Sequence, residues 1–251
     1  QNLRDALDEL VLNQVTLTVV SAAEADWVAH AAARVGGPAM VHVKIDTGMG
    51  RSGVRADRAA TLIQYIRNLP GIRLCGLYTH FANADGSDQA VTNEQAGRFL
   101  AAVDDAGRRD GLLLHAANSA AMLEQPELHM DMVRPGLALY GYDPRDDAAP
   151  RADLRPALRL WGRLMQVKIV PAGSRCGYGL AHRFERDTRV GLAPVGYADG
   201  YLRGLSNQAV MRVRGIDCPV RGRVSMDQTI IDLSAVPEAQ VGDVVEIFSP
   251  D

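Results

Sequence analysis

The sequence contains little of what several protein classes need. Only three of its 251 residues are cysteines, too few for a disulfide framework, which points to a reducing compartment. No apolar run approaches the roughly 18 residues of a membrane-spanning helix. Lysine and arginine (27) nearly balance aspartate and glutamate (30), so the chain lacks the basic face of a nucleic-acid-binding protein. We expect a cytoplasmic protein with neither a nucleic-acid nor a membrane partner.

Several short functional motifs are also absent. The sequence contains no Walker loop and no Gly-x-Ser-x-Gly elbow. Gly48-Met49-Gly50 followed by Arg51-Ser52-Gly53 resembles a phosphate loop only superficially. Its six histidines are scattered without the spacing of metal ligands, and no cysteine pair has the spacing of a zinc site. We therefore expect no metal site. Lysine is scarce as well, since Lys44 and Lys168 are the only two.

The first part alternates short apolar runs with longer alanine-rich stretches of helical period, which predicts βαβ units around a parallel sheet. The predicted strands are Val15–Val20, Val41–Ile45, Leu74–Phe81, Leu112–Ala116 and Met132–Tyr140. The predicted helices are Ala22–Val35, Asp57–Asn68 and Thr92–Arg109. These signals are too few for a closed eight-stranded barrel, so they predict either a doubly wound sheet or strands four to eight of a barrel.

The pattern changes near residue 145. Arg145–Pro156 is rich in Asp, Ala and Pro and predicts a linker. Short strands with few helices follow, at Leu160–Val170, Arg189–Ala193, Ala209–Val213, Thr229–Leu233 and Val244–Ile247. They predict a small antiparallel β domain. We expect an α/β domain over residues 1–150 and a β domain over residues 151–251.

Polar residues lie at the ends of the predicted parallel strands, where ligands bind in α/β folds. They are Lys44, Asp46, His80, Asn118, Ser119 and Arg134. Any one of them alone is more often an ordinary core or loop group, but the whole set at one edge favours a site.

Two loops at this edge have the chemistry of a phosphate site. Loops after the last strands of a barrel commonly bind phosphate, and here they contain Ser119 and the sequence Arg134-Pro135-Gly136-Leu137. Gly136 lets the backbone approach an anion closely. Gly and Pro also serve as ordinary turn residues, so both interpretations stay open.

The β domain contains turns rich in tyrosine. They are Gly177-Tyr178-Gly179, Gly196–Tyr201 and Ser225–Gln228. A tyrosine between glycines is often only an aromatic residue at a strand end. It becomes a candidate base where nearby positive charge lowers its pKa from about 10.

Six strings, in order and over nearly the whole chain, resemble the alanine racemase family. They are VHVKIDTGMGRSGV (41–54), GLYTHFANAD (76–85), HAANSAAML (115–123), MVRPGLALYG (132–141), PVGYADGYLR (194–203) and GRVSMDQTIIDL (222–233). The resemblance implies a partial (β/α)8 TIM-type barrel, about strands four to eight, followed by a β-rich domain. It also implies an isomerase that interconverts L-alanine and D-alanine, for peptidoglycan, with pyridoxal 5'-phosphate and two bases. The family works as a head-to-tail homodimer with shared active sites.

The resemblance also implies roles for individual residues. Tyr178 matches the catalytic tyrosine that the partner subunit contributes, and Tyr197 matches an entrance residue. Arg51, Met226 and Asp227 match substrate-binding positions. The cofactor-binding positions are His80, Ser119, Arg134, Gly136 and Leu137. Lys44 matches a lysine that is often carbamylated in the family, whose negative charge positions Arg51.

The sequence departs from the family at the lysine that holds the cofactor. That lysine lies in a Lys-Ala-Asn/Asp-Ala-Tyr-Gly-His-Gly context, which is absent here. Lys44 matches a different role, and Lys168 lies in a predicted β-domain strand. Near Tyr178, His182 stands where some members have an aromatic residue. We interpret the chain as an internal segment that lacks the cofactor-lysine strand and the extreme C-terminus, and that is inactive alone. The alternatives are a non-catalytic binding or sensor protein with the same barrel, or a racemase of serine or another amino acid.

Overall fold

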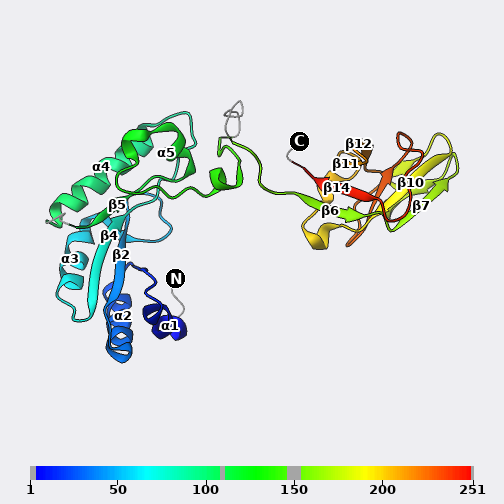
Figure 1. Ribbon diagram of the computed structural model, residues 1–251. Coiled ribbons are helices and arrows are strands. Elements are labelled where there is room, and N and C mark those ends of the chain that lie inside the picture. The colour runs from blue at the N-terminus through cyan, green and yellow to red at the C-terminus, as the bar shows by residue number, and fades with distance from the viewer. Residues whose placement is uncertain (1–3, 108–110, 146–153, 250–251) are drawn as a thin grey trace. The chain divides into compact units, whose positions relative to one another are not determined.

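The computed structural model describes residues 4–107, 111–145 and 154–249 (Figure 1). The chain forms two compact units, residues 1–155 and residues 156–251. The expected boundary at residue 150 and most of the expected linker lie outside the described residues. The helix predicted to end at Arg109 ends at Asp105, because Gly107 has a φ of 62°. No described helix is long and apolar enough to cross a membrane.

The first unit is built on a parallel sheet of order β1-β2-β4-β5, with the short β3 paired to β2. Its strands are β1 (Leu17–Val19), β2 (Ala39–Asp46), β3 (Val54–Arg55), β4 (Ile72–Tyr78) and β5 (Leu113–His115). Its α-helices are α1 (Leu7–Leu12), α2 (Ala22–Val35), α3 (Ala56–Arg67), α4 (Ala90–Asp105) and α5 (Ser119–Glu124). Short 3-10 helices occur at η1 (Arg4–Ala6), η2 (Pro126–Leu128) and η3 (Leu137–Tyr140).

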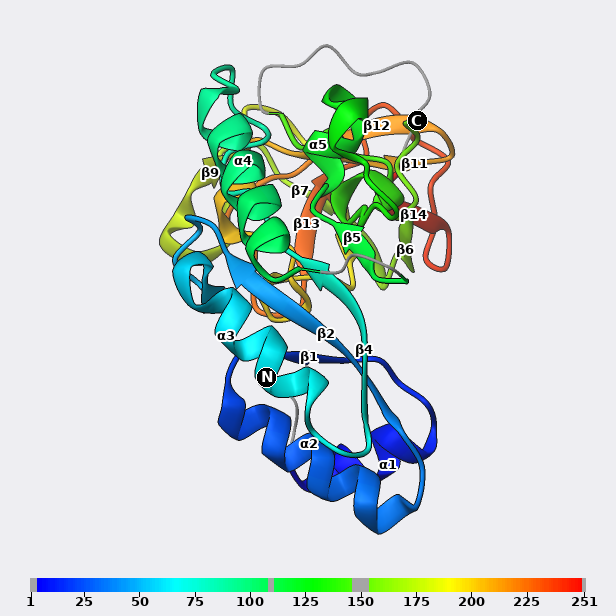
Figure 2. The ribbon, with the colours of Figure 1, turned by 90° about the vertical axis from the view of Figure 1, so that its left-hand side faces the viewer.

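The sheet has one apolar face and one polar face. Along β2, Val41, Val43 and Ile45 are fully buried in the core that the helices cover. Figure 2 shows α2, α3 and α4 on that side of the sheet. Because side chains alternate along a strand, His42 and Lys44 point to the opposite face. The fold therefore presents a polar face beside a well-packed apolar one.

Caps fix the helix that leads into β2. The Ser21 hydroxyl accepts a hydrogen bond from the backbone N–H of Glu24, and the Glu24 carboxylate accepts one from Val20. This resembles a capping box, except that Glu24 accepts from the residue before the N-cap rather than from Ser21 itself. The helix ends at Gly36, whose φ of 77° suits a residue without a side chain.

The strand predicted over Met132–Tyr140 is wrong. Pro135 has no N–H to give to a ladder, and the backbone N–H groups of Gly136 and Ala138 donate to the Ser119 hydroxyl instead. The chain then turns into η3. This segment is therefore a loop whose backbone is directed toward the β5–α5 connection.

The second unit consists of antiparallel sheets of order β13-β10-β7, β12-β11-β14-β6 and β8-β9. Its strands are β6 (Leu160–Arg163), β7 (Gln166–Val170), β8 (Arg175–Cys176), β9 (His182–Arg183), β10 (Thr188–Ala193), β11 (Val210–Val213), β12 (Ile216–Pro219), β13 (Thr229–Asp232) and β14 (Val244–Phe248). Its 3-10 helices are η4 (Tyr178–Leu180), η5 (Tyr197–Asp199) and η6 (Arg203–Leu205).

The single strand predicted over Leu160–Val170 is two strands in different sheets. The chain changes sheet at Leu164 and Met165, whose N–H groups donate to Asp243 and Leu192 respectively. Leu164 is fully buried between the sheets. The apolar run thus supplies one buried corner rather than one continuous strand.

Candidate functional site

Arg134 is the most constrained side chain at the polar edge of the first unit. One terminal nitrogen donates to Nδ1 of His115 at 2.7 Å. The other donates to the carbonyl oxygens of Thr79 at 2.8 Å and Ala116 at 3.1 Å, and approaches Nδ1 of His80 at 3.3 Å. Among the described residues, Nε has no hydrogen-bond acceptor. The guanidinium is thus fixed in one orientation, with its Nε–H among the donors left for a ligand.

Burial and nearby positive charge disfavour the protonated forms of the neighbouring bases. Burial and the charges of Arg134, Arg51 and Lys44 lower the pKa of His80 to about 4. Burial and the charges of Arg51 and Arg134 also lower the pKa of Lys44, against the opposing effect of Asp46. The edge is therefore strongly cationic and suited to an anionic ligand.

The loop that follows β2 carries Arg51. One carboxylate oxygen of Asp46 accepts hydrogen bonds from the backbone N–H groups of Gly48, Met49 and Gly50 at 3.0, 3.0 and 3.1 Å. Burial opposes ionisation of Asp46, but these three bonds outweigh it and lower its pKa. The exposed Arg51 therefore starts from a loop that is pinned to the end of the strand.

Ser119 joins two loops at the same edge. Asn118 caps α5 by accepting from the N–H of Ala121, which fixes the start of the helix. The buried Ser119 hydroxyl accepts from the N–H groups of Gly136 at 2.8 Å and Ala138 at 3.2 Å. A hydroxyl and two backbone N–H groups thus converge at one point, with the exposed Leu137 beside them.

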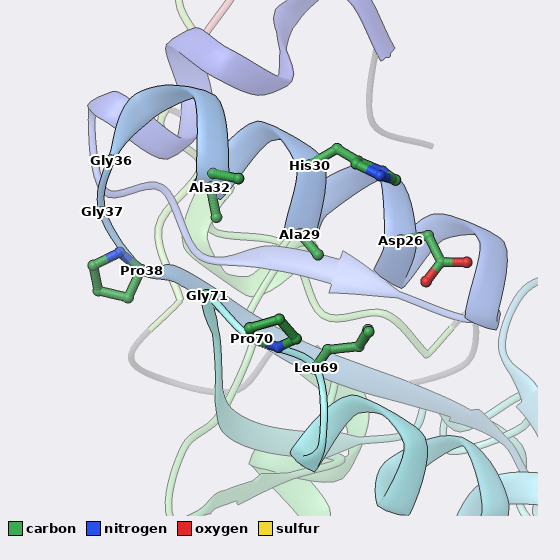
Figure 3. Close-up of a pocket in the computed structure, with 11 residues that line it drawn as sticks. Asp26, Ala29, His30, Ala32, Gly36, Gly37, Pro38, Leu69, Pro70 and Gly71 are labelled. Atoms are coloured by element: carbon green, nitrogen blue, oxygen red, sulfur yellow. The ribbon is translucent and has the colours of Figure 1, made fainter.

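A pocket of about 390 Å3 lies on the polar face. Its lining includes Lys44, His80 and Arg134 together with Tyr78, His42 and His115. A larger pocket of about 660 Å3 lies at the opposite, amino ends of β2 and β4, between α2 and the loops 36–38 and 69–71 (Figure 3). None of the predicted site residues lines the larger pocket.

In the second unit, three turns meet around the segment 222–226. Tyr197 donates its N–H to the Ser225 carbonyl at 3.0 Å, and Ala198 donates to Met226 at 2.8 Å. A Cβ at Gly177 would lie 2.9 Å from the backbone nitrogen of Arg223, and a Cβ at Gly179 would lie 3.1 Å from the guanidinium of Arg223. The turns that carry Tyr178, Tyr197, Met226 and Asp227 are therefore one packed cluster.

Comparison with known proteins decides the family. Residues 2–144 match the family description "Alanine racemase, N-terminal domain", and residues 157–251 match "Alanine racemase, C-terminal domain". The chain belongs to the alanine racemase family. Its parallel sheet with helices and its β-rich unit are the partial barrel and the second domain expected for that family.

Named alanine racemases are similar over almost the whole chain. That of Desulfovibrio desulfuricans is 46% identical over 96% of this chain and 66% of its own length, and that of Methanococcus maripaludis is 38% identical over 97% and 66%. The solved alanine racemase of Clostridium difficile has a TM-score of 0.88 at 34% identity, covering 99% of this chain and 66% of its own. The chain thus spans slightly less than two thirds of these alanine racemases.

The structure also brings forward residues that the sequence did not single out. His115 bonds directly to Arg134, and Arg223 packs beneath the Tyr178 turn. His115 stands at the end of a predicted strand, and this position is the signal that could have pointed to it. Arg223 lies in a string shared with alanine racemases, but only the folded structure shows which turn it supports.

Proposed function

We propose that this chain forms the larger part of an alanine racemase that interconverts L-alanine and D-alanine with pyridoxal phosphate. The proposal rests on the fixed guanidinium of Arg134 and on the Ser119 cradle, by which we mean the Ser119 hydroxyl with the backbone N–H groups of Gly136 and Ala138. Both occur in a chain that belongs to this family. A role in supplying D-alanine for peptidoglycan, in the cytoplasm, is part of the same proposal.

The donor set fits the cofactor. Ser119 keeps its own O–H to donate to a phosphate, and the Gly136 N–H, which donates to Ser119 Oγ in the structure, would turn to the phosphate on binding. The nearest atom to a Cβ at Gly136 is Ser119 Oγ at 3.9 Å, so the backbone there is open to a ligand. Leu137 would flank the phosphate. Nε of Arg134 is left to face the pyridine nitrogen, and neutral His80 would lie beside the ring.

Arg134 would restrict the chemistry to racemisation. Pyridoxal phosphate, when bound, supplies an electron sink for the α-carbon of the substrate. An arginine does not give up its proton, so Arg134 would hold the ring nitrogen without protonating it. The sink would then stay shallow, which would favour return of the proton to the α-carbon over transamination.

Tyr178 would act on one face of the substrate. Racemisation removes a proton from one face of the α-carbon and returns one to the other, so it needs two bases. The Tyr178 hydroxyl would hold the proton on one face, and the lysine that holds the cofactor would serve the other. We assign that second role to neither Lys44 nor Lys168.

Arg51 and the loop of the second unit would handle the substrate. Arg51 would bind the substrate carboxylate, and Met226 and Asp227 would complete its pocket, with Tyr197 at the entrance. Carbamylation of Lys44 fits its lowered pKa, because only the neutral amine adds to carbon dioxide, losing a proton as the carbamate forms. The carbamate would then hold Arg51 in place.

We further propose a head-to-tail homodimer with shared sites. Tyr178, Met226 and Tyr197 are 68%, 57% and 46% exposed, which suits contact with a partner. Mixing inactive Arg134→Ala and Tyr178→Phe proteins should restore about a quarter of the normal activity, because half of the dimers are mixed and one of their two sites is intact. No recovery after subunit exchange would contradict shared sites.

A racemisation assay tests the function itself. The protein as its gene encodes it, supplied with pyridoxal phosphate, should convert L-alanine into D-alanine, and L-serine run in parallel tests the choice of substrate. Faster racemisation of serine would replace the proposed substrate. Cofactor binding that depends on Arg134, with no racemisation of any amino acid, would favour the non-catalytic sensor and overturn the proposal.

A further inference from the structure

Three side chains on the polar face of the first unit form a continuous hydrogen-bonded row. Arg134 lies 2.7 Å from Nδ1 of His115, and Nε2 of His115 lies 2.9 Å from Nδ1 of His42. Arg134 comes from the loop before η3, His115 ends β5, and His42 lies in the middle of β2. His42 is therefore the inner end of a row whose outer end is the guanidinium proposed to face the cofactor.

Arginine fixes the direction of every bond in this row. A guanidinium has only donors, so Nδ1 of His115 must be an unprotonated acceptor. The proton of the neutral His115 ring is then on Nε2, which donates to Nδ1 of His42, and His42 carries its own proton on Nε2. An imidazolium at either position would have no acceptor to offer and would break a bond of the row.

The surroundings keep both rings neutral. Burial and the charge of Arg134, together with His42, lower the pKa of His115 to about 3, although Asp131 opposes the shift. Burial likewise lowers the pKa of His42.

The backbone of β4 makes room for His42. The register between β2 and β4 shifts so that Val41 pairs with Leu74 and His42 with Gly76, leaving Cys75 as an extra residue. A Cβ at Gly76 would lie 2.7 Å from Nε2 of His42 and 2.7 Å from the Leu113 carbonyl oxygen. Only glycine therefore fits there with the His42 ring in its present place.

Stacking on Tyr78 alone does not decide between two orientations of the His115 ring. Its ring stacks on Tyr78 with centroids 4.7 Å apart and planes 8° apart, and the Tyr78 hydroxyl is held by Thr18 at 2.9 Å. A half-turn of the imidazole within this stack would exchange its nitrogen and carbon edges while keeping the aromatic contact. Hydrogen bonds to Arg134 and His42 are what select between the two orientations.

We propose that His42 is a positioning residue for Arg134 that acts through His115. It holds the His115 ring in the orientation and tautomer that accept from the guanidinium, and so directs Nε of Arg134 toward the ligand. The effect on the cofactor rests on the proposed function, whereas the orientation of the His115 ring does not.

A matched pair of substitutions separates the hydrogen bond from the packing. The side-chain oxygen of His42→Asn can still accept from His115, whereas His42→Leu has a similar shape and no acceptor. His42→Leu loses the hydrogen bond from His115, in a row of bonds that ends on the charged Arg134. We expect this loss to weaken pyridoxal phosphate binding about tenfold, whereas His42→Asn should weaken it less than about threefold. Equal affinities in the two variants would overturn the positioning role.

Ring nitrogen shifts of protein labelled with 15N-histidine give a readout without activity. The unsubstituted protein at neutral pH should show His115 protonated on Nε2 and not on Nδ1, and His42→Asn should keep this pattern. His42→Leu should show the other tautomer or an exchange-broadened ring. A proton on Nδ1 of His115 in the unsubstituted protein would overturn the inference without any variant. Correct tautomers with no racemase activity would instead refute the proposed function alone.

Discussion

The carboxylate of Asp46 should be the main stabiliser of the loop that carries Arg51. Asp46→Ala removes one acceptor from three backbone N–H groups, at Gly48, Met49 and Gly50. A hydrogen bond contributes about 0.5–1.5 kcal/mol net, and more when the acceptor is charged. Since water can reach the two exposed glycines after the substitution, we place the loss for the three bonds together in the lower part of the range that these values give, at about 2–3 kcal/mol. Asp46→Asn keeps an acceptor oxygen but loses the charge, so it should cost about 1 kcal/mol.

Tryptophan fluorescence can follow this loss in the first unit alone. The chain has two tryptophans, Trp27 in α2 and Trp161 in β6 of the second unit. In a Trp161→Phe background, the urea-unfolding curve therefore reports on the unit that contains Asp46. The expected order of unfolding free energy is parent, then Asp46→Asn, then Asp46→Ala, at an unchanged m-value. A change below about 0.5 kcal/mol for Asp46→Ala would refute the reasoning, because surface substitutions without such a role give changes of that size.

Three further predictions concern the cradle, the buried imidazole and a close backbone contact. Ser119→Ala should weaken pyridoxal phosphate binding about tenfold, measured by titration, and an unchanged affinity would remove Ser119 from the phosphate site. Because the folded pKa of His115 is about 3, below its unfolded value near 6.5, the unfolded chain binds more protons between these values. The stabilisation from neutral His115 is complete above about pH 6.5 and should fall by about 1 kcal/mol between pH 6 and pH 5, a slope that a His115→Asn variant should lack. Gly196→Ala would place a Cβ 2.3 Å from the Ser225 carbonyl, whereas a Cβ at Gly204 meets nothing within 4 Å. In thermal unfolding, Gly196→Ala should cost more than about 2 kcal/mol and Gly204→Ala should be near neutral, so equal melting temperatures would contradict the contact.

Elements with a simple period could be predicted from the sequence. The alternation in β2 places Val41 and Val43 in the core and His42 on the polar face, as a period of two requires. Ser21 and Gly36 mark the ends of α2 in the same local way. The collection of polar residues at the strand ends followed from the rule that parallel strands end at one edge.

The predictions that failed concern segments whose structure is decided by contacts between residues far apart in the sequence. The segment Met132–Tyr140 has the local pattern of a strand, but Ser119 takes its backbone donors from 17 and 19 positions away. The bond between His42 and His115 joins residues 73 positions apart, and it depends on a bulge in β4 that only the isolated Gly76 marks in the sequence. Spacing along the chain therefore made these histidines look scattered.

Deuterium exchange by Tyr178→Phe tests most directly whether this chain serves a two-base racemase. The full protein carrying this substitution, loaded with pyridoxal phosphate, would be incubated in heavy water with L-alanine and separately with D-alanine. The account predicts that deuterium enters the α-carbon of one enantiomer without inversion, while exchange of the other and racemisation are lost. Equal and mild losses with both enantiomers would show that Tyr178 is not the base on one face.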